Sequence, residues 1–265
     1  MLQVQLHHGA PVATWLTLRE LRGHDEAVLE SGDPWAATAL IGRLASLPAE
    51  DSQPRAFDAW AMSVSDRDRV AAALYRELYG SRIDTSIDCG KCKARMDIDF
   101  ELSSVERTPD LGGVEVCKEQ IDGVTYWLHE GLGRFRVPTV RDQVQLMRWP
   151  ADARAEALTQ RCLPDVANDV RTCGALEELL ERVAPTHDVD LAATCPECET
   201  EQEVRFDLHA YLGASLLRES RYLTHEMHRI ACAYGWGRAE ILELRREERR
   251  HFVRLIEREG RAARR

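Results

Sequence analysis

The sequence contains almost no lysine. Its 265 residues include only Lys91, Lys93 and Lys118, and none of them lies in a Gly-Lys-Ser or Gly-Lys-Thr sequence. A nucleotide-binding loop of the usual phosphate-cradling kind is therefore absent. The formal net charge of −10 also disfavours a general affinity for nucleic acid, whose phosphates attract basic proteins. We expect no nucleic-acid partner on these grounds.

Hydrophobic runs long enough to cross a membrane are missing as well. No stretch approaches the roughly 18 consecutive apolar residues of a membrane span. The first residues show no basic start followed by an apolar core, as a secretion signal would. With 44% apolar and 30% charged residues, the composition is that of an ordinary globular protein. We expect a cytoplasmic protein without a membrane partner.

The sequence signatures of common hydrolases are also absent. The chain has neither a His-Glu-x-x-His nor a Gly-x-Ser-x-Gly sequence. His225 and His228 stand three residues apart, but the helical spacing around them favours an ordinary helix surface over a pair of metal ligands. We therefore expect no enzymatic activity, no catalytic residue and no small-molecule substrate.

The most informative feature that is present is a duplicated Cys-x-x-Cys sequence. Cys89-Gly-Lys-Cys92 and Cys195-Pro-Glu-Cys198 each run into a segment in which polar and apolar residues alternate. Alternation with a period of two is typical of a half-buried strand. We predict that each copy is a cysteine turn, called a knuckle below, between an approaching and a departing strand. Three apolar pairs at matching offsets indicate an internal duplication: Ile98 and Val204, Phe100 and Phe206, and Leu102 and Leu208.

Thiolates in this arrangement point to a metal. Four of them complete the tetrahedral coordination of Zn²⁺, so we predict that Cys89, Cys92, Cys195 and Cys198 bind one structural zinc ion per chain and join the two halves. The long separation between the pairs is a weak signal by itself, and the duplicated context strengthens it. Two alternatives stay open: pairs without metal, or two separate sites. The obvious additional ligands for separate sites are His187, His209 and Cys117.

Redox chemistry is a further interpretation of paired cysteines. Thioredoxin-type pairs lie at the beginning of a helix, whose dipole stabilises the thiolate. Strand patterns follow both pairs here, which disfavours disulfide exchange. The other cysteines share no spacing, and we interpret them as small buried apolar residues. They are Cys117, Cys162, Cys173 and Cys232.

The predicted fold class is α+β, with two knuckle-and-hairpin halves joined at a zinc site and helical N-terminal and C-terminal segments. Residues 15–47 have the spacing of an amphipathic helical layer, and the proline-containing residues 47–54 are predicted to link this layer to the next helix. Ser65 is the expected N-cap of that helix and Gly80 its end. The predicted segments are residues 1–60, 61–137, 138–210 and 211–265.

The second half of the chain predicts short strands and then helices. Strands are expected between 114 and 137, around a hairpin turn at Asp122-Gly123, and at 188–193. A helical pair is predicted at the end of the chain, broken at Gly235-Trp236-Gly237. The remaining predicted helices are 139–149, 151–162 and 175–183.

The end of the chain is rich in arginine. Residues 245–265 contain nine arginines and four glutamates. Three interpretations are open: a solvated helix face with ion pairs between successive turns, a docking helix for a protein partner, and a nucleic-acid contact. Apolar residues along the same helix favour a protein over a nucleic acid as the partner.

Several segments, taken in order, resemble a known family. They are Leu18 to Glu26 (LRELRGHDE), Asp66-Arg67-Asp68, the two knuckles, Arg136-Val137-Pro138-Thr139, and Ala233 to Trp236 followed by Glu240-Ile241-Leu242 and the arginine-rich helix. This order is similar to that in the baseplate hub proteins of contractile-tailed phages and of phage-derived contractile injection systems. The resemblance runs from about residue 16 to residue 258. The order carries it, since no single segment is diagnostic.

The resemblance implies a non-enzymatic structural or assembly subunit that binds other baseplate or hub subunits. Such a protein is cytoplasmic during assembly and can become part of the particle. The four knuckle cysteines are then the zinc ligands. Many relatives have a small polar residue after the tryptophan, whereas this chain has Gly237, which weakens the expected cap of the last helix. The candidate partner surface consists of Tyr234, Trp236, Arg245, Arg246, Arg249 and Arg250.

The alternative function is a zinc-ribbon adaptor for nucleic acid or the transcription machinery. Such an adaptor needs a continuous basic face around the knuckles. Lys91, Lys93 and Arg95 give only a hint of one, and only at the first knuckle. Glutamates make the second knuckle acidic, which disfavours this function.

Overall fold

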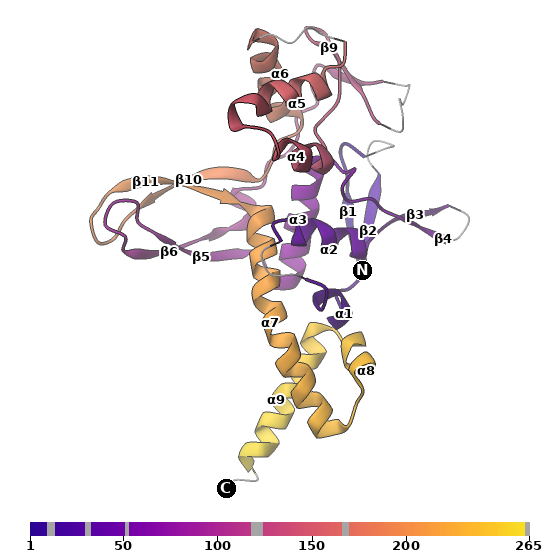
Figure 1. Ribbon diagram of the computed structural model, residues 1–265, viewed down its shortest axis with the longest axis vertical. Helices are drawn as coiled ribbons and strands as arrows, with labels where there is room; N and C mark the ends of the chain where they lie inside the picture. Colours follow the sequence, from indigo (N-terminus) through magenta and orange to yellow (C-terminus); the bar gives the residue numbers. More distant parts are fainter. Residues whose placement is uncertain (10–13, 30–32, 51–52, 118–123, 166–169, 263–265) are drawn as a thin grey trace.

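The computed structural model has a central body from which three parts extend (Figure 1). The structure describes residues 1–9, 14–29, 33–50, 53–117, 124–165 and 170–262. A lobe of helices and short strands lies at one end of the long axis, a helical foot lies at the other, and an arm of two hairpins projects sideways. The mixture of helices with antiparallel sheets agrees with the predicted class.

The body contains a four-stranded antiparallel sheet. Its strands are adjacent in chain order: β1 (Leu2–Gln5), β2 (Trp15–Leu18), β3 (Ala45–Glu50) and β4 (Gln53–Ala56). The connection between β2 and β3 contains two helices, α1 (Gly23–Glu26) and α2 (Ala36–Leu44).

The helical N-terminal segment predicted for residues 1–60 is therefore wrong in large part. Leu16 and Leu18 are buried whereas Trp15 is 48% exposed, so this stretch follows the strand period of two. In so short a segment, the spacing of Leu16, Leu18 and Leu21 also fits a helix. The segment forms a strand because Leu16 pairs with Val4 of β1. The predicted link at 47–54 is also wrong, since its described residues, 47–50 and 53–54, belong to the paired strands β3 and β4.

The main hydrophobic core lies between this sheet and three helices, namely α2, α3 (Val64–Tyr79) and the first half of α7 (Leu208–Tyr234). Ser63, and not the predicted Ser65, caps α3: its hydroxyl accepts a hydrogen bond from the Asp66 amide at 3.0 Å. The helix ends at Gly80 as predicted, with a φ of 88°. Fully buried residues at the centre include Leu16, Leu40, Ile41, Val70, Ile83, Leu102, Leu208, Leu212 and Leu216.

His209 is buried in this body and makes stability depend on pH. Its Nε2 atom lies 2.8 Å from the Thr38 hydroxyl. Burial, together with the charge of Arg67, lowers the pKa of His209 from 6.5 to about 3. The folded state therefore favours the neutral ring, so its contribution is complete above pH 6.5 and is lost as the pH falls from 6.5 towards 3.

We expect His209→Gln to weaken this pH dependence. As the pH is lowered from 6.5 to about 5, the free energy of unfolding should fall less steeply in the variant. The difference in slope should grow from about 0.7 kcal/mol per pH unit at pH 6.5 to nearly 1.4 kcal/mol per pH unit at pH 5. Urea unfolding at a series of pH values measures both slopes. Equal slopes in the two proteins would show that His209 is not held neutral. His7, His8 and His187, whose pKa values burial also lowers, account for the slope that remains.

The lobe contains the predicted short strands and helices around a second core. Its strands form a three-stranded antiparallel sheet, and the predicted turn at Asp122-Gly123 lies outside the described residues. Trp127, Phe135 and Leu176 are buried between the sheet and the helices. The elements of the lobe are β7 (Val114–Val116), β8 (Trp127–His129), β9 (Gly133–Phe135), α4 (Val140–Leu146), the 3₁₀ turn η2 (Ala151–Ala153), α5 (Arg154–Cys162) and α6 (Val170–Val183).

The arm is built from two matching antiparallel hairpins. The first consists of β5 (Arg82–Asp88) and β6 (Arg95–Glu101), after which the 3₁₀ turn η1 (Leu102–Ser104) leads to the lobe. The second consists of β10 (Asp188–Thr194) and β11 (Glu201–Asp207) and continues directly into α7. Both pair seven residues with seven, so the predicted duplication of approach strand, knuckle and departing strand is confirmed.

The foot consists of the second half of α7, α8 (Arg238–Glu243) and α9 (Arg246–Ala262). Gly235 ends α7 with a φ of 70°, at the predicted break. Gly237 has no side chain to cap α8, and the Glu240 carboxylate instead accepts a hydrogen bond from the Gly237 amide at 2.7 Å. A helix therefore starts next to Gly237 in spite of the glycine.

Gly23 lets α1 approach the foot closely. A Cβ at this position would lie 3.0 Å from both the Leu242 Cα and the Arg249 Nη1 atom. We expect Gly23→Ala to lower the free energy of unfolding by about 1–3 kcal/mol, the usual effect of overpacking. The matched control is Gly174→Ala in α6, where a Cβ meets nothing within 4 Å. The control should be neutral or stabilising by up to about 1 kcal/mol, and urea unfolding of both variants tests the contrast.

Candidate metal centre

The two knuckles, residues 89–94 and 195–200, have the same backbone conformation. The amide of each first cysteine donates across the turn, from Cys89 to the Ala94 carbonyl at 2.9 Å and from Cys195 to the Thr200 carbonyl at 3.0 Å. The residue after each second cysteine has a positive φ, which is 62° at Lys93 and 55° at Glu199. This turn places both sulfurs of a knuckle on the same side.

All four sulfurs meet between the two hairpins. They lie within 4.8 Å of one another. The shortest contacts join the knuckles: Cys89 Sγ lies 3.7 Å from Cys198 Sγ, and Cys92 Sγ lies 3.6 Å from Cys195 Sγ. An ideal tetrahedron with metal–sulfur bonds of about 2.3 Å has sulfur–sulfur edges of about 3.8 Å. The spacing thus fits one four-coordinate metal and is far longer than a disulfide bond of about 2.05 Å.

The burial of the cysteines follows the duplication. Cys89 and Cys195, the first of each pair, are completely buried, whereas Cys92 is exposed and Cys198 partly exposed. Met96 completes a small apolar cluster with Cys89 and Cys195. A metal here would therefore be shielded on its inner side and close to the protein surface on the other.

The electrostatics of the cluster require a cation if all four thiols are to ionise. Hydrogen bonding with the side chain and backbone of Thr200 lowers the pKa of Cys198 to about 6. At Cys92 a backbone hydrogen bond from Ala94 acts in the same direction, but contact with Cys198 and the other sulfurs raises its pKa to about 12. Like charges this close cannot all form without compensation. A divalent metal supplies that compensation, and its binding releases the protons.

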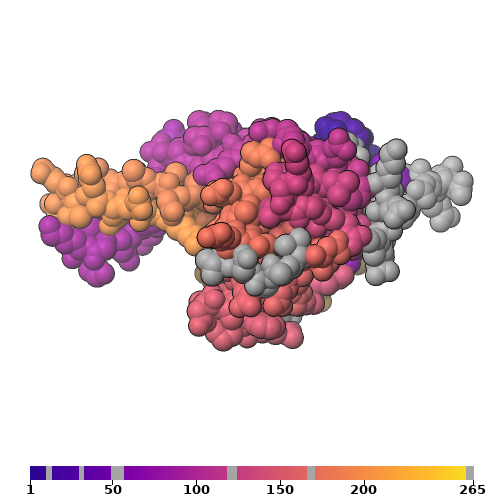
Figure 2. Space-filling model, turned by 90° about the horizontal axis from the view of Figure 1, so that it is seen from above, coloured from indigo at the N-terminus to yellow at the C-terminus, as the bar shows by residue number. Residues whose placement is uncertain are grey.

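Contacts between the hairpins extend from the cysteines to the base of the arm. The Gln202 side chain accepts a hydrogen bond from the Gly90 amide at 2.9 Å. Nearer the body, the rings of Phe100 and Phe206 meet edge to face with centroids 5.0 Å apart. The Tyr211 hydroxyl donates to the Asp84 carbonyl at 2.6 Å. The two hairpins are thus stacked along their length (Figure 2).

The geometry favours the single shared site over the alternatives. Within the described part of the chain, the four knuckle cysteines are the group that could hold a metal ion. His187 and His209 are engaged elsewhere, with the Arg107 carbonyl and the Thr38 hydroxyl respectively. Strands follow both knuckles, as predicted, so neither pair has the helix dipole of a thioredoxin-type site. Four thiolates also leave no coordination position for a substrate.

The other cysteines differ from their predicted burial in part. Cys162 is buried in the lobe, and burial raises the pKa of its thiol to about 12. Cys117 and Cys173 are partly exposed, and Cys232 is exposed on α7. The interpretation of all four as buried residues is therefore wrong for Cys232.

Two members of the predicted partner surface are buried inside the protein. Arg246 is 8% exposed and Arg249 is 1% exposed. Both bind the carboxylate of Glu26 from α1, Arg246 through Nε at 2.5 Å and Arg249 through Nη2. Arg249 also binds Glu226 at 2.9 Å and the Leu244 carbonyl at 2.9 Å. The prediction that they contact a partner is wrong: they fasten the foot to the body.

The other four predicted contact residues remain accessible. Tyr234 is 38% exposed, and its ring lies 5.4 Å from that of Trp236. Phe252 packs against both rings and so fixes this corner at the end of the foot. The side chains of Arg245 and Arg250 are 46% and 42% exposed, and each pairs with a glutamate of this chain.

Two of the segments that carry the family resemblance, those that begin at Asp66 and Arg136, form hydrogen bonds that connect different parts of the chain. The carboxylate of Asp68 accepts hydrogen bonds from Arg67 and from the His187 amide, so α3 holds the chain that enters the second hairpin. In the lobe, Arg136 binds Asp142 through two nitrogens at 2.6 and 2.9 Å. Burial by itself would raise the pKa of Asp142, but these hydrogen bonds and those from Thr139 hold it well below its usual range.

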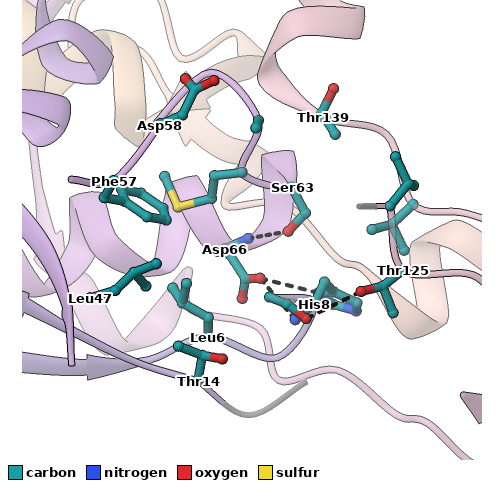
Figure 3. A pocket seen from close by; sticks show the side chains of 15 residues that line it. Leu6, His8, Thr14, Leu47, Phe57, Asp58, Ser63, Asp66, Thr125 and Thr139 are labelled. Carbon is teal, nitrogen blue, oxygen red and sulfur yellow. Dashed lines mark hydrogen bonds and ion pairs between the residues drawn. The ribbon is translucent and has the colours of Figure 1, made fainter. Parts of the chain in front are cut away.

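A cavity of about 200 Å³ lies where the body meets the lobe (Figure 3). His8 and Asp66 point towards each other in its wall. Both oxygens of Asp66 are used, since they accept hydrogen bonds from the His7 and His8 amides at 2.7 and 2.8 Å. The His8 ring continues the connection to the Val183 carbonyl of the lobe, with Nε2 2.8 Å from the oxygen. The polar groups of this cavity therefore join segments of the chain. Sequence reasoning missed this role because the partners are far apart in sequence.

No protein-family model, no curated protein and no solved structure matches the chain. Among the described residues, no helix is both long and apolar enough to cross a membrane.

Proposed function

We propose that the protein is a non-enzymatic structural or assembly subunit of a phage tail or phage-tail-like contractile injection system, with one structural zinc ion. The observation that carries the proposal is the cluster of Cys89, Cys92, Cys195 and Cys198, called the clamp below. It joins two hairpins that are distant in sequence into one projecting arm. A fixed arm of this kind is suited to holding neighbouring subunits at a set angle. The order of segments described above supports the particular machine.

Zinc is the metal that the ligand set fits best. Soft thiolates select zinc or iron among the common cellular metals, and four thiolates in a tetrahedron are typical of structural zinc. Cys89, Cys92, Cys195 and Cys198 would hold the ion. Its role would be to stabilise the fold and to orient the two hairpins.

Several internal ties support a scaffolding role. The segments that resemble the hub family contain Glu26, Asp66 and Arg136, each of which binds groups from a distant or neighbouring element. The connection from α7 to α8, which follows the exposed Tyr234, lies in the foot, away from the arm (Figure 1). A subunit with two separated contact regions can join two different neighbours.

The proposal is tested by deleting the gene from its source and examining lysates by negative-stain electron microscopy. We expect sheathed particles to be lost, to return with the wild-type gene, and not to return with the Cys89→Ser, Cys195→Ser variant. Normal numbers of contractile particles after deletion would overturn the proposal. The absence of sheath, tube and baseplate genes near this gene would also contradict it.

A nucleic-acid adaptor is the second candidate, because the first knuckle is basic. Fluorescence anisotropy with DNA and RNA duplexes at low salt tests it. We expect no binding, because the glutamates of the second knuckle repel phosphates. Salt-sensitive binding that is lost in Lys91→Glu, Lys93→Glu would favour the adaptor.

A further inference from the structure

The two knuckles combine one backbone geometry with opposite charges. Counted from the first cysteine of each copy, three basic residues of the first knuckle and its departing strand occupy the positions of three acidic residues in the second. The backbones match closely: the Lys93 and Glu199 amides donate to the carbonyls of Cys89 and Cys195 at 3.0 and 2.9 Å. The pairs are Lys91 and Glu197, Lys93 and Glu199, and Arg95 and Glu201.

These six side chains form two charged faces at the end of the arm. Lys91, Lys93 and Arg95 are the basic face, and Glu197, Glu199 and Glu201 are the acidic face. All six residues are exposed. Because the hairpins are stacked, the two faces belong to different layers of the arm (Figures 1 and 2).

Within the described part of the chain, neither face forms an ion pair, although Asp88 is the cross-strand partner of Arg95. Closer to the body, charges of the same hairpins are paired, as in Arg82 with Asp99 at 2.6 Å and Arg205 with Asp188. At the tip, no ion pair among the described residues involves any member of either face. Lys93 Nζ instead donates to the Gly90 carbonyl at 3.1 Å. Complementary charges are thus left available to an outside partner.

We propose that this partner is a second copy of the same chain, whose acidic knuckle face binds the basic knuckle face of the first. Each copy carries both faces, so the contact is self-complementary, either reciprocally about a twofold axis or from head to tail. The clamp holds both faces in place before binding, which lowers the cost of ordering them. Like charges oppose the same contact in any other register, which gives it specificity. This contact goes beyond the proposed function and needs no other subunit.

Charge balance at the metal centre is the competing explanation of the basic face. Four thiolates with one divalent metal carry a net charge of −2, which nearby lysines would stabilise. That explanation leaves the acidic face without a role, because Glu197, Glu199 and Glu201 lie beside the same negative centre and raise its electrostatic energy. Binding between copies accounts for both faces.

Charge exchange between copies tests the contact. One variant carries Lys91→Glu, Lys93→Glu and Arg95→Glu, and so has two acidic faces. The other carries Glu197→Lys, Glu199→Lys and Glu201→Lys, and so has two basic faces. In sedimentation velocity at low salt, we expect the wild-type protein to self-associate, each variant alone to be monomeric, and the equimolar mixture to associate. Raising the salt to about 0.3 M should weaken association of the wild type at least tenfold.

Several outcomes would overturn the proposal. These are a wild-type protein that stays monomeric at low salt, variants that associate as well as the wild type, or a mixture that does not associate. Metal analysis of both variants shows whether the clamp survives, and loss of metal only in the variant with two acidic faces would support charge balance instead.

A carbodiimide, which joins an amine to a carboxylate, gives a test on unmutated protein. In mixtures of isotope-labelled and unlabelled copies, Lys91 or Lys93 should become linked to Glu197, Glu199 or Glu201 of the other copy, and links within one copy alone would contradict the contact.

Discussion

Replacing Cys89 and Cys195 by serine should remove the metal and separate the two hairpins of the arm. Both cysteines are fully buried and each belongs to a different knuckle, so the double variant damages both halves of the site. We expect the metal content to fall to near zero and the free energy of unfolding to fall on the order of 3 to 5 kcal/mol. This is less than the ~10 kcal/mol or more found in small zinc peptides, because the body and lobe retain their own cores.

The effect should be confined at first to the arm. Hydrogen exchange at the backbone amides of positions 89 and 195, which close the knuckles, should accelerate strongly in the double variant, while that of α3 changes little. The matched control is Cys232→Ser, which alters an exposed cysteine outside the cluster and should keep both metal and stability. A double variant as stable as the control, with unchanged exchange in the arm, would disprove the clamp.

Truncation of Arg249 should be the most damaging change in the foot. The side chain is 1% exposed and binds Glu26, Glu226 and the Leu244 carbonyl. Arg249→Ala leaves the buried Glu226 without its main partner and leaves Glu26 with Arg246 alone. Removal of one member of such a buried group costs about 3–5 kcal/mol. We expect a loss of that size in urea unfolding, together with faster exchange in α9.

Two further substitutions make this prediction specific. Arg254→Ala removes an exposed arginine from the same helix and should change stability by no more than about 0.5 kcal/mol. Arg249→Lys keeps the charge but not the forked geometry, so it should lose an intermediate amount. Equal stability of Arg249→Ala and Arg254→Ala would mean that the buried ion pairs do not fasten the foot to the body.

The two knuckle-and-hairpin halves of the fold could be predicted because the same local sequence pattern occurs twice. A Cys-x-x-Cys turn followed by alternating residues is a local pattern, and its repetition at matching offsets identifies Phe100 and Phe206 as equivalent positions. The structure brings these two rings into contact. The meeting of all four sulfurs follows from the same duplication, since each copy offers half of a tetrahedral site.

The N-terminal sheet could not be predicted in the same way. Leu16 and Leu18 lie on one face of a strand, but with Leu21 nearby they also fit the face of a helix. Which period applies depends on pairing with β1 and β3, a tertiary contact that local spacing does not encode. The capping serine of α3 was misplaced by two residues for a related reason, because Ser65 binds a carbonyl of the lobe connection instead.

The roles of the arginines in α9 depend on distant partners. By its composition the helix looks like a solvated surface, and this is correct for Arg245 and Arg254. Arg246 and Arg249 are buried because Glu26, near the other end of the chain, supplies the carboxylate that makes their burial tolerable. A sequence shows that charges are present but not which of them meet.

One metal ion is proposed to join the two knuckles, and the architecture of the arm depends on it. Native mass spectrometry of protein purified without added metal tests it most directly. We predict a single species that carries one zinc ion per chain and in which thiol reagents leave all four knuckle cysteines unmodified until a chelator removes the ion. A metal-free species with four reactive knuckle cysteines, in a protein of unchanged stability, would contradict the claim.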